Sequence, residues 1–144
     1  MAELTLEIAQ SIVSAALKHA RAQKMKPLGV AVLDARGALK AYAAEDKSSL
    51  RREAIAHGKA YGSLALGMGS RAIDARARER PHFMAAVSHV TGPLVPVPGG
   101  VLIRDGAGDV VGAVGVSGDT SDNDEAAAVA GIKAAGFTAD PGAA

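Results

Sequence analysis

The sequence has 144 residues and no cysteine, which excludes disulfides, a thiolate nucleophile and cysteine-ligated zinc. Its 16 basic and 15 acidic residues leave a net charge of +1, which gives no electrostatic reason to expect nucleic-acid binding. With two Phe, two Tyr and no Trp, it also lacks an aromatic platform on which bases could stack. No run of about 18 apolar residues predicts a membrane span. We therefore expect a single cytoplasmic domain over residues 1–144, without nucleic-acid or membrane partners.

A helix followed by a hairpin is predicted at the beginning of the chain. Apolar residues recur at helical spacing over residues 6–23, and Thr5 is the expected N-cap. The segments GVAVLD (residues 29–34) and LKAYAA (residues 39–44) are short runs typical of strands. The four residues 34–37, Asp-Ala-Arg-Gly, have the composition of a tight turn and would join the two strands.

The middle of the chain predicts two more helices. The first covers about residues 50–66, with Ser48 and Ser49 as candidate caps and Gly67 and Gly69 near its end. The second covers about residues 73–80 and ends at Pro81, after which comes a short segment, PHFMAAVSHV.

A second hairpin and a last helix are predicted after a proline-rich stretch. One further strand is expected near Val95, and residues 101–105 and 110–118 form the hairpin. The helix covers about residues 123–135, with Ser121 or Asp122 as its cap, and the tail from 139 to 144 is expected to be frayed. The order of elements predicts an α/β fold of the α+β type, in which a central antiparallel sheet of about five strands, built from two hairpins, is flanked by helices.

The glycine-rich strand and the acidic loop after it do not predict a phosphate or metal site. Four carboxylates within residues 119–125 would repel a phosphate, and their spacing does not match a calcium-binding loop. We expect these acids to favour the helix N-terminus, and the glycines to permit close packing.

The histidines do not predict a shared zinc site, because no two of them are four residues apart. His19 lies at the border of the apolar face of the first helix, where a histidine is more often solvated or hydrogen-bonded within the core. Imidazole is nevertheless a frequent protein ligand of haem iron, and such a site needs only one histidine.

The second helix carries the densest group of polar residues. Glu53 and His57 are four residues apart and should share a face. Lys59 shares a face with Ile55, so its stem is expected to be partly covered. Such a lysine can anchor a carboxylate or act as a base; the other interpretation is an ordinary surface lysine with a buried stem.

Several segments in this order resemble the GlcG/HbpS family over about residues 4–135. They are PLGVAVLDARGAL, the A-x-x-K-A run at Ala56, Lys59 and Ala60, VPVPGGVLI, and VVGAVGVSGDTSDNDEAAAVAG. The resemblance implies an antiparallel sheet flanked by helices, a high-order homo-oligomer such as an octamer, and a small-molecule ligand that is haem or a corrinoid in several members. It also implies that His19 is the haem-iron ligand; no other metal site is expected.

Three functions follow as hypotheses. The first is an oligomeric haem- or tetrapyrrole-binding protein. The alternative is a small catabolic enzyme or carrier for an organic acid, with Glu53, His57 or Lys59 as catalytic candidates. Its carboxylate anchors and backbone donors would be Arg51, Arg52, Lys59, Gly99, Gly100 and Gly118. A purely structural assembly protein is the third and least favoured hypothesis.

Overall fold

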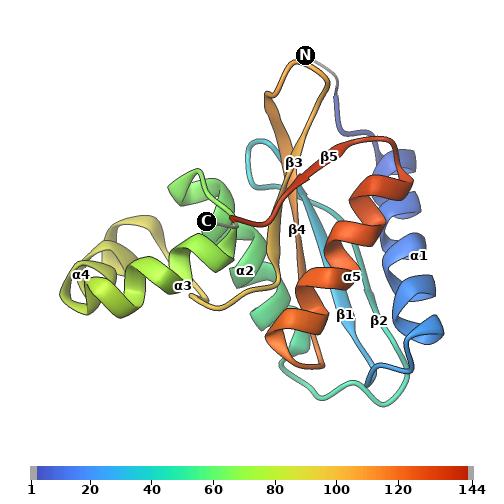
Figure 1. The fold of residues 1–144 in the computed structure, drawn as a ribbon, viewed down its shortest axis with the longest axis horizontal. Coiled ribbons are helices and arrows are strands. Elements are labelled where there is room, and N and C mark those ends of the chain that lie inside the picture. Colours follow the sequence, from blue (N-terminus) through green and yellow to red (C-terminus); the bar gives the residue numbers. More distant parts are fainter. Residues whose placement is uncertain (1–2, 143–144) are drawn as a thin grey trace.

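A computed structural model describes residues 3–142 as a five-stranded antiparallel sheet with helices on both faces (Figure 1). The elements in chain order are α1 (Leu6–Ala22), β1 (Gly29–Asp34), β2 (Leu39–Ala44), α2 (Arg52–Leu66), α3 (Ser70–Glu79), α4 (Pro81–Thr91), β3 (Gly100–Arg104), β4 (Val110–Ser117), α5 (Ser121–Ala134) and β5 (Thr138–Asp140). The predicted fold class is confirmed. Within residues 3–142, no helix combines the length and hydrophobicity needed to cross a bilayer.

The strand order β2-β1-β4-β3-β5 places the two hairpins side by side. Strands β1 and β4 pair at the centre, where Val30 lies opposite Val116. Both predicted hairpins are confirmed. The first turn is held by Asp34, whose carboxylate accepts hydrogen bonds from the backbone N–H groups of Arg36 and Ala38.

The fifth strand is not where the sequence predicted it. Val95 lies in the irregular segment between α4 and β3, and the fifth strand is instead β5, which pairs with β3. Arg104 and Asp140 form an ion pair of 2.9 Å across these two strands. The predicted frayed tail, residues 139–144, overlaps this strand, because residues 139 and 140 pair with β3. Residues 143 and 144 lie outside the described residues.

The helix ends differ from the prediction in three places. The segment after Pro81, predicted only as a short segment, forms the helix α4 over residues 81–91. Pro81 follows the end of α3 and occupies the first turn of α4, where proline is well tolerated. Ser48 does not cap α2, because its hydroxyl donates to the carbonyl of Glu45. Thr120, rather than Ser121 or Asp122, caps α5, whereas the predicted Thr5 cap of α1 is confirmed.

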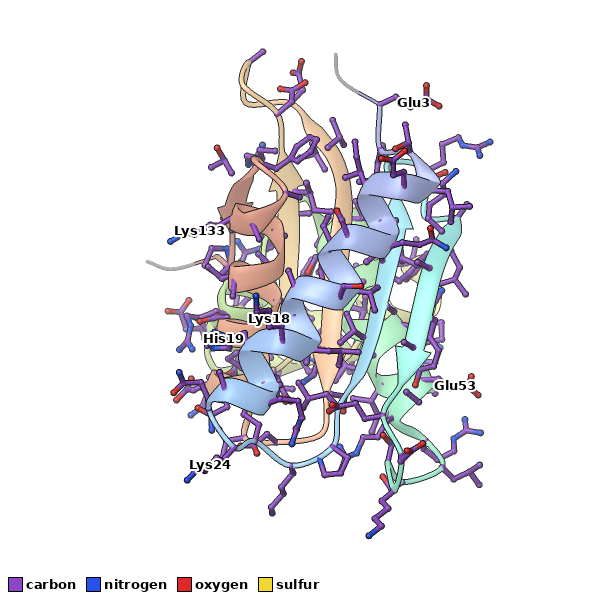
Figure 2. The ribbon with its side chains drawn as sticks, turned by 90° about the vertical axis from the view of Figure 1, so that its right-hand side faces the viewer. Glu3, Lys18, His19, Lys24, Glu53 and Lys133 are labelled. Carbon is purple, nitrogen blue, oxygen red and sulfur yellow. The ribbon has the colours of Figure 1, made fainter. Side chains whose placement is uncertain are left out.

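The two faces of the sheet are covered by different helices. Helices α1 and α5 pack on one face, against a core that includes Val30, Val32 and Val116 (Figures 1 and 2). Helix α2 packs on the other face, where Leu33 and Ala60 belong to a smaller core. Helix α2 lies close to β4, because a Cβ added at Gly115 would overlap the carbonyl oxygen of Ala56.

We predict that Gly115→Ala lowers the free energy of unfolding by about 1–3 kcal/mol, because the new methyl group meets backbone that cannot rotate away. Urea denaturation followed by circular dichroism measures the change. Gly106→Ala is the matched control, since a Cβ there meets no atom within 4 Å. Equal stabilities of the two variants would contradict the close approach of α2 and β4.

Candidate functional site

A hollow of about 470 Å³ lies between the N-terminal half of α2 and the edge of the sheet at β2. Its volume falls within the usual range for small-molecule sites, about 300–1,000 Å³. The residues that line it are Ala31, Leu39, Tyr42, Arg51, Glu53, Ala54, His57, Gly58 and Pro93. The hollow therefore combines apolar walls with a few polar groups.

His57 is the imidazole of this hollow, and its ring is stacked with a neighbouring aromatic ring. The rings of His57 and Tyr61, one helical turn apart on α2, are stacked with centroids 6.1 Å apart and planes inclined by 12°. The Tyr61 hydroxyl in turn donates a hydrogen bond to the carbonyl of Thr91 at the end of α4. Tyr61 thus contacts both His57 and the end of α4.

Glu53 and Tyr42 are two further polar residues of the hollow. Glu53 is exposed and lies one turn before His57, so the structure brings together the two residues whose four-residue spacing the sequence singled out. Burial and the negative charge of Glu53 raise the pKa of Tyr42. Tyr42 was not predicted as a site residue from the sequence, although a large side chain between Ala41 and Ala43 in a predicted strand was a signal for it.

The two arginines at the start of α2 have different roles. Arg51 is exposed and lines the hollow, and no hydrogen bond or ion pair of its side chain occurs among residues 3–142. Arg52 instead donates hydrogen bonds to the hydroxyls of Ser49, at 2.9 Å, and Ser117, at 3.0 Å. Arg52 therefore connects α2 to the end of β4 and does not line the hollow.

Lys59 does not line the hollow either, because its whole side chain is buried, with 2% exposed. Its Nζ donates to the carbonyl of Val116 at 2.9 Å and to Asp124 Oδ2 at 3.1 Å. Burial lowers the pKa of Lys59 and raises that of Asp124, while the opposite charge of each partner acts against these shifts. The second oxygen of Asp124 accepts from the backbone N–H of Asp119, so this pair ties α2 to β4 and α5.

The three glycines that the sequence singled out are packed against backbone or against Lys59. A Cβ at Gly99 would lie 2.7 Å from Lys59 Nζ, and one at Gly100 would overlap the carbonyl oxygen of Lys59. The N–H of Gly100 already donates to the hydroxyl of Ser70 at 2.6 Å. A Cβ at Gly118 would overlap the carbonyl oxygen of Pro27. None of the three lines the hollow beside α2, and ligand binding by them stays a prediction.

His19 lies on α1, which covers the opposite face of the sheet from α2 (Figure 2). It is half-buried and is not among the residues that line the hollow beside α2. Its role as a haem ligand, implied by the resemblance, therefore also stays a prediction.

The family model described as haem degrading protein HbpS-like matches residues 4–133, so the chain belongs to the HbpS-like family. Among solved structures, the PduOC complex with heme is 21% identical, with a TM-score of 0.84 over 94% of this chain and 97% of that one. HbpS is 24% identical (TM-score 0.81, covering 93% and 91%), and the Klebsiella pneumoniae protein ORFY is 23% identical (TM-score 0.82, covering 94% and 93%). These likenesses establish the shared fold. No curated protein matches the chain.

We predict that Lys59→Met lowers the free energy of unfolding by about 3–5 kcal/mol, because it leaves the Asp124 carboxylate buried without its partner charge. Urea denaturation measures the loss. The double variant Lys59→Met, Asp124→Leu should recover a large part of it, since an apolar pair of similar volume replaces both charges. Lys133→Met, at an exposed lysine of α5, controls for the loss of one charge. If Lys59→Met and Lys133→Met have equal stabilities, the pair does not stabilise the fold.

Proposed function

We propose that this chain binds haem or a related tetrapyrrole in the hollow beside α2. The observation that carries the proposal is an imidazole, that of His57, in the wall of a largely apolar hollow. Membership of the HbpS-like family supports it, as does the likeness to the PduOC complex with heme.

The residues of the hollow fit the chemistry of haem. Apolar walls suit the faces of a porphyrin, and the His57 imidazole is a donor that haem iron accepts. Arg51, which has no partner among residues 3–142, offers a guanidinium to a propionate carboxylate. When bound, haem would supply a redox-active iron, and the chain itself would bind and orient it.

His19 is the competing iron ligand, because the family resemblance implies a histidine on the first helix. The sheet separates α1 from α2, so a haem in the hollow beside α2 could bind His57 but not His19 of the same chain. We therefore assign the iron to His57 and retain His19 as the alternative that the experiment must separate.

The organic-acid hypothesis receives less support from the geometry. Of its three proposed carboxylate anchors, Lys59 is buried in an ion pair and Arg52 is bonded to two serines. Only Arg51 remains in the hollow, together with Glu53 and His57 as candidate bases. We rank an enzyme or carrier acting at this site second.

We predict that titrating the purified protein with hemin shifts the Soret band and saturates at one hemin per chain. In His57→Ala the shift should weaken or disappear, because the iron loses its imidazole, whereas His19→Ala should retain it. The reverse pattern would place the iron at His19 and contradict the hollow as the site. Absence of any shift in the unmodified protein would contradict haem binding altogether.

We also propose that the chain forms a homo-oligomer, with an octamer as the expected state. Helix α4 supports this proposal, because it projects from the sheet and has only Met84 buried (Figure 1). Val90 of the same helix is 85% exposed, and Phe83 is 36% exposed. A second copy would remove these apolar side chains from water.

We expect Val90→Glu to lower the molecular mass measured by size-exclusion chromatography with light scattering, because a charge would be buried in the interface. Ala126→Glu on the exposed side of α5 adds the same charge elsewhere and should leave the mass unchanged. A monomeric unmodified protein, or equal masses for all three proteins, would contradict an interface at α4.

A further inference from the structure

A second groove lies on the other side of β2, between that strand and α1. Its volume is about 420 Å³, and Lys40 is the only charged residue that lines it among residues 3–142. The residues that line it are Leu6, Gln10, Val13, Ser14, Lys40, Ala41, Tyr42 and Ala43. Lys40 was not predicted as a site residue from the sequence, and it does not line the proposed haem site.

A β-bulge directs Lys40 into this groove. Val32 of β1 lies opposite Ala41, but the next residue, Leu33, lies opposite Leu39, so Lys40 is the extra residue of β2. Such a residue interrupts the alternation of side chains and can re-aim one of them. As a result, Leu39 lines the hollow beside α2, whereas Lys40 lines the groove beside α1.

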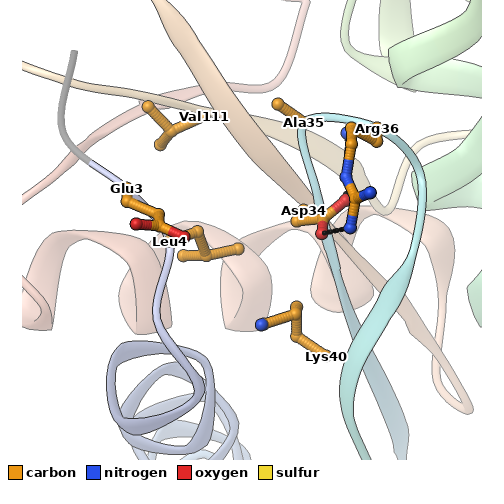
Figure 3. A pocket seen from close by; sticks show the side chains of 7 residues that line it. All are labelled: Glu3, Leu4, Asp34, Ala35, Arg36, Lys40 and Val111. Carbon is orange, nitrogen blue, oxygen red and sulfur yellow. Dashed lines mark hydrogen bonds and ion pairs between the residues drawn. The ribbon is translucent and has the colours of Figure 1, made fainter.

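Lys40 is half-buried, and its ammonium has no ion-pair partner among residues 3–142. It also borders a smaller hollow of about 290 Å³, into which its side chain points (Figure 3). Two acids line that hollow with it, Glu3 and Asp34, and neither forms an ion pair with Lys40. Asp34 is engaged by Arg36 at 3.4 Å and by two backbone N–H groups. The positive charge of Lys40 is therefore available to an anion that enters the groove.

Side chains of α1 form the wall of the groove that faces β2. Leu6, Gln10 and Ser14 follow one another at four-residue intervals and so lie on one side of the helix. Leu6 is 52% exposed at the rim, and Val13 and Ala43 add apolar surface. The groove thus offers one cation, amide and hydroxyl groups, and an apolar surface within one small volume.

We propose that this groove binds a small monocarboxylate with a short apolar chain, and that Lys40 binds its carboxylate. The ammonium supplies a charge-assisted hydrogen bond, and the apolar chain removes the exposed side chain of Leu6 from water. The site is separate from the haem hollow and does not depend on the proposed function. A haem propionate is also a carboxylate, so the experiment has to distinguish it from a free acid.

The test is a titration of the protein with hexanoate, followed by two-dimensional amide NMR. Hexanoate should shift the amide signals of residues 10–14 and 40–43. The neutral hexanamide, which has the same chain without the charge, should bind at least about threefold more weakly, in keeping with one partly exposed ion pair. Lys40→Gln should weaken hexanoate binding by a similar factor and abolish the preference for hexanoate over hexanamide.

Lys18→Gln is the matched control, because it removes the same charge from an exposed position of α1 that does not line the groove (Figure 2). It should bind hexanoate like the unmodified protein. The proposal is overturned if hexanoate causes no shifts, if Lys40→Gln binds it unchanged, or if the shifts fall on residues 51–58. A hemin titration of Lys40→Gln separates the two sites. If they are distinct, the Soret shift of this variant should equal that of the unmodified protein. A reduced shift would mean that Lys40 binds a haem propionate, which would also overturn the proposal of a separate site.

Discussion

Helix α2 packs so closely on strand β4 that no side chain fits between the two backbones. This contact fixes the position of α2 on the sheet, and with it the residues on that face. A Cβ at Gly115 would overlap the carbonyl oxygen of Ala56, and one at Gly100 of the neighbouring strand would overlap that of Lys59. The buried Lys59–Asp124 pair then closes the junction between α2, β4 and α5. Because a buried charge without its partner is strongly unfavourable, the pair permits little variation in how α2 sits on the sheet.

The two sides of α2 therefore have different roles. The inner side carries Ala56, Lys59 and Ala60, all buried, and holds the helix in place. The outer side at the same level carries Glu53 and His57, which are exposed and line the hollow. A helix fixed by its inner side can present an imidazole in a constant position, which is what a ligand for a rigid planar group requires.

The free edge of the sheet at β2 has hollows on both of its faces. One bulge in that strand sends the apolar side chain of Leu39 to the α2 side and the ammonium of Lys40 to the α1 side. The two hollows therefore differ in chemistry, the first carrying an imidazole and the second a lysine. Tyr42 borders both, so a ligand on one side lies close to the other.

The sequence by itself determined the helices α1, α2, α3 and α5, both hairpins and the antiparallel sheet, because hydrophobic period and turn chemistry are local properties. It also placed Glu53 and His57 on one face of α2, since spacing along a helix is local as well. Only the tertiary structure decided that Lys59 is buried against Asp124, that β5 pairs with β3, and that Lys40 lines the groove beside α1. Each of these depends on a partner far away in the chain or on strand register, and a one-residue irregularity in register changes the face on which a side chain lies.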